Sequence, residues 1–107
     1  MSDVISVDDG NFESEVINSK LPVLVDFSAP WCGPCSRQLP ILEKFAKDNL
    51  TKVKVVKIDI DECQALSSKY GIRSVPSLLL FNNGQNIGMK VGLLPQSALD
   101  QFVSEKC

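Results

Sequence analysis

The sequence predicts an α/β protein, built as a three-layer α/β/α sandwich around a mixed sheet. Two observations lead to this fold class. Stretches rich in β-branched and apolar residues alternate with stretches of helical periodicity, which is the pattern of strands joined by helices. A hairpin signal and a last helix then follow, so the sheet should contain antiparallel as well as parallel strands.

The first elements are a helix, a strand and a longer helix. Asn11 precedes acids and apolar positions that fit a short capped helix over 12–17. The run 21–29 is almost continuously apolar, so we expect a strand that is buried on both faces. Apolar residues recur every three or four positions over 35–48, which predicts a helix, and Pro40 should kink it because proline has no amide hydrogen.

The second half of the chain is expected to form strands, helices and a hairpin. Gly71 suits a left-handed cap at the end of a helix. The segment Asn82-Asn83-Gly84-Gln85 favours a hairpin turn with positive φ. The elements, in order, are the strand 53–58, the helix 62–70, the strands 78–81 and 87–91, and the helix 97–107.

Length and composition limit the class of protein. The 107 residues are enough for one domain with its own apolar core, so we expect a single domain spanning residues 1–107. A net charge of −2 provides no basic surface for nucleic acid or an anionic membrane, so we expect protein partners. We also expect a monomer. The chain has no histidine, which excludes Ser-His-Asp and Cys-His hydrolases and histidine-bound metal centres.

The N-terminal segment and the cysteines indicate the cellular compartment in which we expect the protein. Acids occur early, with no basic segment before an apolar run, so we expect no secretory signal. The apolar stretches 23–27 and 75–81 are far shorter than the roughly 20 residues that span a bilayer. We therefore expect a cytoplasmic protein. In that reducing compartment, four cysteines indicate thiol chemistry rather than a framework of structural disulfides.

The segment Trp31-Cys32-Gly33-Pro34-Cys35 lies between the buried strand and the longer helix. Cys32 should sit at or just before the helix N-terminus, where unpaired amides and the helix dipole favour a thiolate and lower the pKa of the thiol. Cys35 follows one turn later, within reach of the Cys32 sulfur. Gly33 keeps a side chain away from both sulfurs, and Pro34 stiffens the turn.

This arrangement predicts thiol–disulfide exchange that requires no cofactor and no metal. Cys32 would attack a target disulfide, and Cys35 would then displace the reduced target. A pair of buried, unreactive cysteines and half of a zinc site are the alternatives. Zinc would need two further ligands, and without histidine only Cys63, Cys107 or carboxylates could supply them.

An acid lies within the first buried strand. Asp26 is surrounded in sequence by apolar residues, and burial of a carboxylate is costly unless it is protonated or paired. We expect its pKa to be raised, with Lys57 in the next strand as its partner. The alternative is a partly exposed acid at the end of a strand and a solvated lysine.

A resemblance to the thioredoxin family covers nearly the whole chain. It is carried by the active-site segment Val25-Asp26-Phe27-Ser28-Ala29-Pro30-Trp31-Cys32-Gly33-Pro34-Cys35 and by the later blocks 57–62, 70–77, 81–84 and 91–92. The resemblance implies the thioredoxin fold, with a mixed five-stranded sheet and four helices. It also implies a protein-disulfide reductase that acts on disulfide-containing proteins and is regenerated by an NADPH-dependent thioredoxin reductase.

The same resemblance implies roles for residues around the dithiol. Asp26 would assist proton transfer to or from Cys35, and the Val75–Pro76 bond would be cis, which frees the Val75 backbone to pair with an extended target. The implied target-binding residues are Trp31, Gly33, Pro34, Ile72, Val75, Pro76 and Gly92. From the residues alone, core packing of Trp31 and Ile72 and a simple strand end at Gly92 stay open.

Three positions depart from the common pattern of the family. Ser28 stands where many members have tryptophan, Ser77 where threonine is common, and Gln38 in place of a frequent apolar residue. These changes could alter the reduction potential or the choice of partner. Cys63 and Cys107 lie outside the motif, and we expect both to be bystanders. The alternative functions are an oxidase or isomerase on the same fold, and a binding subunit whose redox cycle is incidental.

Overall fold

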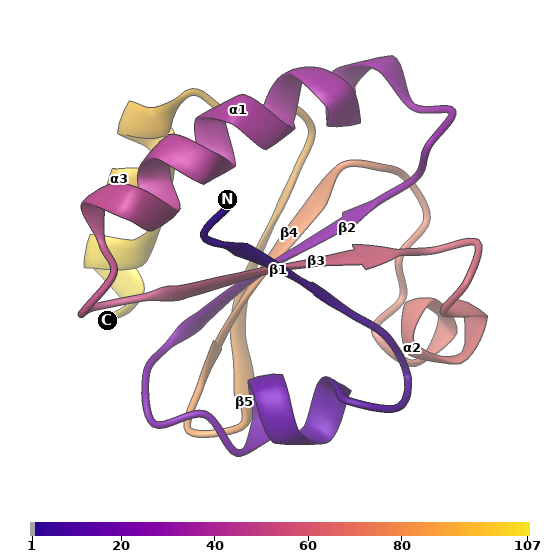
Figure 1. Cartoon of the computed structure of the whole chain (residues 1–107), viewed down its shortest axis with the longest axis horizontal. Helices are drawn as coiled ribbons and strands as arrows, with labels where there is room; N and C mark the ends of the chain where they lie inside the picture. Colours follow the sequence, from indigo (N-terminus) through magenta and orange to yellow (C-terminus); the bar gives the residue numbers. More distant parts are fainter. Residues whose placement is uncertain (1) are drawn as a thin grey trace.

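The computed structural model describes residues 2–107, which form a five-stranded sheet with helices packed on both faces (Figure 1). The elements in chain order are β1 Val4–Val7, the π-helix η1 Glu13–Ile17, β2 Val23–Ser28, α1 Gly33–Asp48, β3 Lys54–Asp59, α2 Gln64–Lys69, β4 Ser77–Asn82, β5 Gln85–Val91 and α3 Gln96–Lys106. Each element given bounds from the sequence occurs, and its ends shift by two residues at most.

The strand order of the sheet is β1-β3-β2-β4-β5. β3 pairs in parallel with β1 and β2, whereas β4 runs antiparallel to both β2 and β5. The sheet is therefore mixed, and the expected fold class is confirmed. β2 is the central strand, and every one of its residues is buried, as its continuous apolar sequence predicts.

Helices cover the sheet on both faces. α1 and α3 lie on one face, and η1 and α2 lie on the other (Figure 1). Phe45 and Phe102 are buried in the apolar cluster under α1 and α3. Phe12, Val16 and Phe27 belong to a second cluster, on the side of η1 and α2. Two cores on opposite faces hold the central strand between them.

The first helix differs from the capped helix expected over 12–17. It is a π-helix, and its N-cap residue is Phe12, which makes no side-chain capping bond. The Asn11 side chain instead accepts a hydrogen bond from the Asp8 amide at 2.8 Å. The capping expectation is wrong because Asn11 closes the turn before the helix rather than the helix end.

Two other local features follow from proline and glycine chemistry. α1 begins at Gly33 and includes Pro40 within one unbroken helix. The hairpin between β4 and β5 turns at Asn83 and Gly84, whose φ angles are 53° and 77°. Both angles are positive, as the Asn-Gly step predicts, and such a two-residue turn matches the twist of antiparallel strands.

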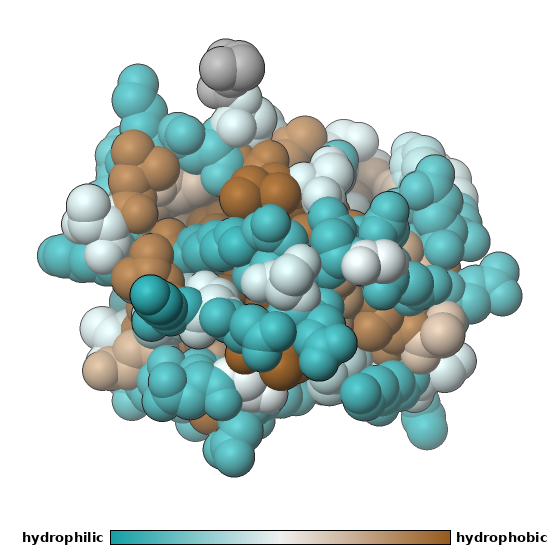
Figure 2. Space-filling view, turned by 60° about the horizontal axis from the view of Figure 1, so that its bottom comes forward, coloured by the Kyte–Doolittle hydropathy of each residue, from teal (hydrophilic) through white to brown (hydrophobic). Residues whose placement is uncertain are grey.

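Hydrophilic residues dominate the face seen in Figure 2, with smaller hydrophobic areas between them. Within residues 2–107, no helix combines the length and the apolar character that crossing a membrane requires. The large hydrophobic side chains that are exposed are Ile5, Trp31, Leu50, Met89, Val91 and Leu93. Trp31 adjoins Cys32 in sequence, and Val91 and Leu93 flank Gly92.

Candidate active site

Cys32 and Cys35 form a disulfide where β2 leads into α1. Cys32 is the N-cap residue of α1, and its Sγ accepts a hydrogen bond from the Cys35 amide at 3.1 Å. The Cα atoms of the two cysteines are 5.2 Å apart. Pro34 lies in the first turn of α1, where its missing amide costs no helical hydrogen bond. The position expected for Cys32 at the helix start is confirmed.

Protein atoms cover most of the disulfide. The exposed fraction is 6% for Cys32 and 5% for Cys35, and both pack with Ala29, Ile60 and Val75. Cys32 Sγ lies 3.7 Å from the carbonyl oxygen of Val75. A target disulfide can therefore approach only over the small area of sulfur that stays open, next to the Val75 backbone.

Asp26 lies within β2, and only 1% of its surface is exposed. Burial raises the pKa of its carboxyl to about 7, and the charge of Lys57 opposes this rise. Among the residues that the structure describes, neither Asp26 carboxylate oxygen has a hydrogen-bond partner. Lys57 is the register partner of Asp26 on β3 and is half-buried. The expected rise in pKa and the facing lysine are confirmed, and the exposed-acid alternative is wrong.

A cavity of about 190 Å³ lies beside Cys35. Its lining includes Cys35 and Lys57 together with the polar residues Ser28 and Asp59. The small Ser28 side chain leaves open a volume that a larger residue at this position would fill. The cavity therefore gives water access to Cys35 and to the lysine that faces Asp26.

The residues around the disulfide differ in exposure. Trp31 is 68% exposed, and its Nε1 donates a hydrogen bond to the Asp61 carboxylate at 2.9 Å. Core packing of Trp31 is therefore excluded. Gly92 has a φ of 99°, and its amide donates to the Pro76 carbonyl at 2.8 Å. Among the other expected target-binding residues, Gly33 and Pro34 are exposed, Ile72 and Val75 are half-buried, and Pro76 is buried.

The backbone and the apolar neighbours of Val75 and Ile72 also bear on the expected surface. The Val75–Pro76 bond is cis, as the family resemblance implies. Ile72 packs against the apolar cluster on the side of η1 and α2. Core contact of Ile72 is therefore present, while the exposed part of its side chain stays free to contribute to an outer surface.

Two contacts near the site were not expected from the sequence. Asp61 follows β3 and reaches Trp31 across 30 positions of the chain. Gln38 is fully buried in α1 and is hydrogen-bonded to Leu94, 56 positions away. In the sequence, Asp61 is an acid that follows a strand, and Gln38 is a polar residue among the apolar positions of a helix. Neither pattern indicates which residue the side chain contacts.

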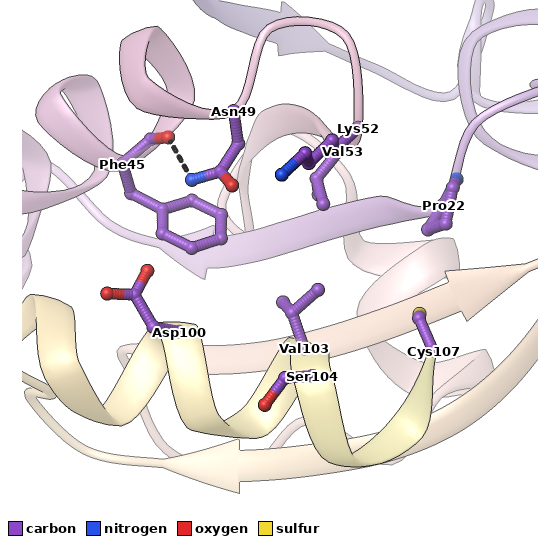
Figure 3. A pocket seen from close by; sticks show the side chains of 9 residues that line it. All are labelled: Pro22, Phe45, Asn49, Lys52, Val53, Asp100, Val103, Ser104 and Cys107. Atoms are coloured by element: carbon purple, nitrogen blue, oxygen red, sulfur yellow. Dashed lines mark hydrogen bonds between the residues drawn. The ribbon is translucent and has the colours of Figure 1, made fainter.

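A second cavity, of about 380 Å³, has neither Cys32 nor Cys35 in its lining. Phe45, Val53 and Val103 line it, and Cys107 lies at its rim on the end of α3 (Figure 3).

Within residues 2–107, no three His, Cys, Asp or Glu side chains come together in a group that could hold a metal ion.

Comparison with known proteins places this geometry in a family. The family model described as Thioredoxin matches residues 3–105. The chain belongs to the thioredoxin family. The Thioredoxin of Haemophilus influenzae is 46% identical over 105 residues, which cover 98% of each chain. The Thioredoxin of Rickettsia bellii is 50% identical over 99 residues, which cover 92% of this chain and 94% of that relative.

More distant thioredoxins match over similar lengths. The Thioredoxin of Porphyra purpurea is 42% identical over 102 residues, or 95% of each chain. The mixed five-stranded sheet with four helices is therefore the thioredoxin fold. Within it, the disulfide of Cys32 and Cys35 occupies the Trp-Cys-Gly-Pro-Cys motif that carries the family resemblance.

Proposed function

We propose that this thioredoxin-family protein is a protein-disulfide reductase that works by reversible thiol–disulfide exchange. Cys32 is the attacking thiolate and Cys35 the resolving thiol. The observation that carries this function is the disulfide between these two residues at the N-terminus of α1. A cysteine pair that bonds at a helix start, with little surface exposed, is suited to open and close during each cycle.

The reaction has two exchange steps. In the reduced protein, the Cys32 thiolate attacks one sulfur of a target disulfide, and the other target sulfur leaves as a thiolate that takes up a proton. Cys35 then loses its proton and attacks Cys32 Sγ, which releases the second target thiol and closes the Cys32–Cys35 disulfide. Two electrons pass from the dithiol to the target.

The helix start favours the attacking thiolate. The Cys35 amide points at Cys32 Sγ at 3.1 Å, and the N-terminal end of α1 contributes its positive dipole at the same place. Both effects stabilise a negative charge on the Cys32 sulfur. They act before a target binds, so they favour the attacking thiolate already in the free, reduced protein.

Asp26 is proposed as the base that takes the proton from Cys35. Its pKa of about 7 allows it to bind and release a proton near neutral pH. The cavity that includes Cys35 and Lys57 in its lining supplies space for water between the strand pair and the sulfur. Lys57 stabilises the ionised form of Asp26 and so keeps its pKa from rising further.

Targets are proposed to bind across the open edge of the disulfide. The contact residues are Trp31, Gly33, Pro34, Ile72, Val75, Pro76 and Gly92. The exposed Trp31 ring offers apolar contact area, and the Val75 carbonyl lies beside Cys32 Sγ, where an extended segment of a target could pair with it.

The wider setting is also a proposal. We infer that the protein acts as a single-domain monomer in the cytoplasm, and that an NADPH-dependent thioredoxin reductase returns electrons to the disulfide. The family membership supports the reductase as a partner. Cys63 and Cys107 are free thiols in this structure, which fits a reducing compartment.

Reduction of insulin disulfides with dithiothreitol as the electron source tests the proposal. Wild type should accelerate the reaction, and Cys32→Ser should reduce the rate to that of dithiothreitol alone. Cys107→Ser is the matched control and should keep the wild-type rate, because Cys107 lies away from the disulfide. An unchanged rate in Cys32→Ser would remove the proposed nucleophile.

Trapping separates the two cysteine roles. Cys35→Ser should accumulate mixed disulfides with insulin chains, visible on a non-reducing gel and lost on reduction. Clean monomers on that gel would contradict a resolving role for Cys35.

A further inference from the structure

Gln38 lies inside α1, one turn after Cys35, and is fully buried. Its side-chain amide makes two reciprocal hydrogen bonds to one backbone unit. Nε2 donates to the Leu94 carbonyl at 3.0 Å, and the Leu94 amide donates to Oε1 at 2.8 Å. A glutamine side chain that is removed from water needs such partners, and here a single residue on a distant segment supplies both.

Leu94 belongs to the segment 92–95, which joins β5 to α3. The same segment is held at its other end, because the Gly92 amide donates to the Pro76 carbonyl at 2.8 Å. The segment is therefore tied at Gly92 to the residue that follows Val75, and at Leu94 to the helix that carries Cys35.

The end of β5 and the segment 92–95 present apolar side chains to solvent on either side of Gly92. Val91 is 56% exposed and Leu93 is 40% exposed. They flank Gly92, which is one of the proposed target-binding residues. The position of this apolar edge relative to the sulfurs therefore depends on how firmly Leu94 is held.

An apolar residue at position 38 could fill the same volume but could not replace the two hydrogen bonds. The amide and carbonyl of Leu94 would then lose the partners that Gln38 supplies. Leu94 is half-buried, and backbone groups that lose their partners in such a place are unfavourable, so we expect the segment to shift toward water or another partner. Such a shift would move the apolar edge while leaving the sulfurs and the start of α1 in place.

We propose that Gln38 is a positioning residue that fixes the segment 92–95 beside the dithiol and thereby sets the affinity for protein targets. Both of its side-chain hydrogen bonds go to Leu94 and neither goes to a sulfur, so we expect exchange itself not to depend on it. The proposal rests on the proposed disulfide reductase function and adds a specificity element to it.

The test compares Gln38→Met with Leu42→Met in steady-state insulin reduction. Methionine keeps an unbranched side chain of similar size but cannot make either bond to Leu94. Leu42 is equally buried on α1 one turn further on, so its replacement controls for altered core packing. Reduction of 5,5′-dithiobis(2-nitrobenzoate), a small disulfide that needs no extended docking surface, reports the reactivity of the active-site sulfurs when it is measured in a Cys107→Ser background, because the exposed Cys107 also reacts with it.

In Gln38→Met, KM for insulin should rise by about five- to tenfold, as expected for loss of hydrogen bonds that hold a docking surface. The kcat for insulin and the rate with the small disulfide should stay within about twofold of wild type. The Leu94 amide should exchange its hydrogen faster. Leu42→Met should leave KM and the exchange of Leu94 unchanged.

Three results would overturn the proposal. These are an unchanged KM in Gln38→Met, an equal rise in Leu42→Met, or a parallel loss of the small-disulfide rate. If Gln38→Met does not fold, Gln38→Leu decides. Leucine likewise offers Leu94 neither a donor nor an acceptor, so KM for insulin should rise to a similar extent, and an unchanged KM overturns the proposal. Failure of wild type itself to reduce insulin would instead refute the reductase function.

Discussion

Asp26 and Lys57 face each other in register on the parallel strands β2 and β3, and the acid is the more deeply buried of the two. Burial dominates the environment of the carboxyl, so its pKa rises to about 7 although a cation lies opposite. The ionised form is therefore unfavourable in the folded protein. This relationship links the chemistry of the site to the stability of the fold.

The stability of the protein should depend on the ionisation of Asp26. The pKa of its carboxyl is about 7 in the folded protein, against 3.8 for an unperturbed aspartate, so the folded protein binds this proton more tightly than the unfolded chain. Ionisation of Asp26 therefore destabilises the folded protein. This destabilisation is absent below pH 3.8, grows as the pH rises, and is complete above about pH 7. It amounts to at most about 4 kcal/mol of unfolding free energy.

Asp26→Asn should remove this part of the pH dependence. Urea unfolding between pH 4 and pH 8, compared for wild type and the variant, measures the effect. Asp100→Asn, at an exposed position on α3, is the matched control and should retain the wild-type slope. A slope in Asp26→Asn as steep as in wild type would show that Asp26 does not titrate in this range.

The hydrogen bond from Trp31 to Asp61 should restrain the exposed indole. Asp61→Ala removes the acceptor, so the ring should move more freely, while the unfolding free energy should fall by less than about 1 kcal/mol. Because Trp31 is the sole tryptophan of the sequence, fluorescence anisotropy reports its mobility directly. Asp61→Asn retains an acceptor oxygen and should behave like wild type. Equal anisotropy in all three proteins would show that the bond does not hold the ring.

Gly88 on β5 should not tolerate a larger residue. A Cβ atom at this position would lie 2.8 Å from Phe102 Cε1 and 3.1 Å from Cζ, inside the packed region under α3. Gly88→Ala should lower the unfolding free energy by about 1–3 kcal/mol. In the double variant Gly88→Ala, Phe102→Leu, the loss of unfolding free energy should be smaller than the sum of the losses in the two single variants.

Gly71→Ala provides the control for the clash. Gly71 has a φ of 67°, and no neighbouring heavy atom lies within 4 Å of the place that a Cβ atom would take, so the cost of this change comes from the backbone alone. That cost should add to the cost of Phe102→Leu without compensation. Simple additivity of Gly88→Ala with Phe102→Leu would argue against the contact.

The two cysteines outside the active site should differ in reactivity. Cys63 is 1% exposed, and burial together with the charge of Asp9 raises the pKa of its thiol, whereas Cys107 is exposed. In the oxidised folded protein, 5,5′-dithiobis(2-nitrobenzoate) should modify Cys107 first. Cys107→Ser should abolish that fast phase, and Cys63 should react only in denaturant. A fast phase that survives in Cys107→Ser would show that Cys63 is accessible.

Local patterns in the sequence were sufficient to predict most of the fold. The strand β2 follows from its continuous apolar run, and the β4–β5 turn follows from Asn83 and Gly84, because both depend on neighbouring residues. The helix predicted over 12–17 occurs as η1, but its π-helical form and its uncapped start were not predicted. Its hydrogen-bond pattern is not determined by the composition of five residues, and the side chain of Asn11 engages Asp8 instead of the helix end.

In the candidate active site, too, residues marked by the local sequence were predicted and contacts between distant segments were not. Cys32 and Cys35 were predicted to bond because residues three positions apart at the start of a helix lie close together. Asp26 and Lys57 were predicted as partners because both lie in apolar strands. Contacts between distant segments, such as Gln38 with Leu94, leave no mark in local spacing, since the partner is a backbone group that any sequence provides.

The ring closed by the disulfide is very small, with a sequence separation of only three residues. A cross-link over so short a span removes few conformations from the unfolded chain, in contrast to one that joins distant parts of a protein. The two apolar cores, one on each side of β2, therefore provide most of the resistance to unfolding. We therefore expect the fold to persist when the Cys32–Cys35 bond opens at every turnover.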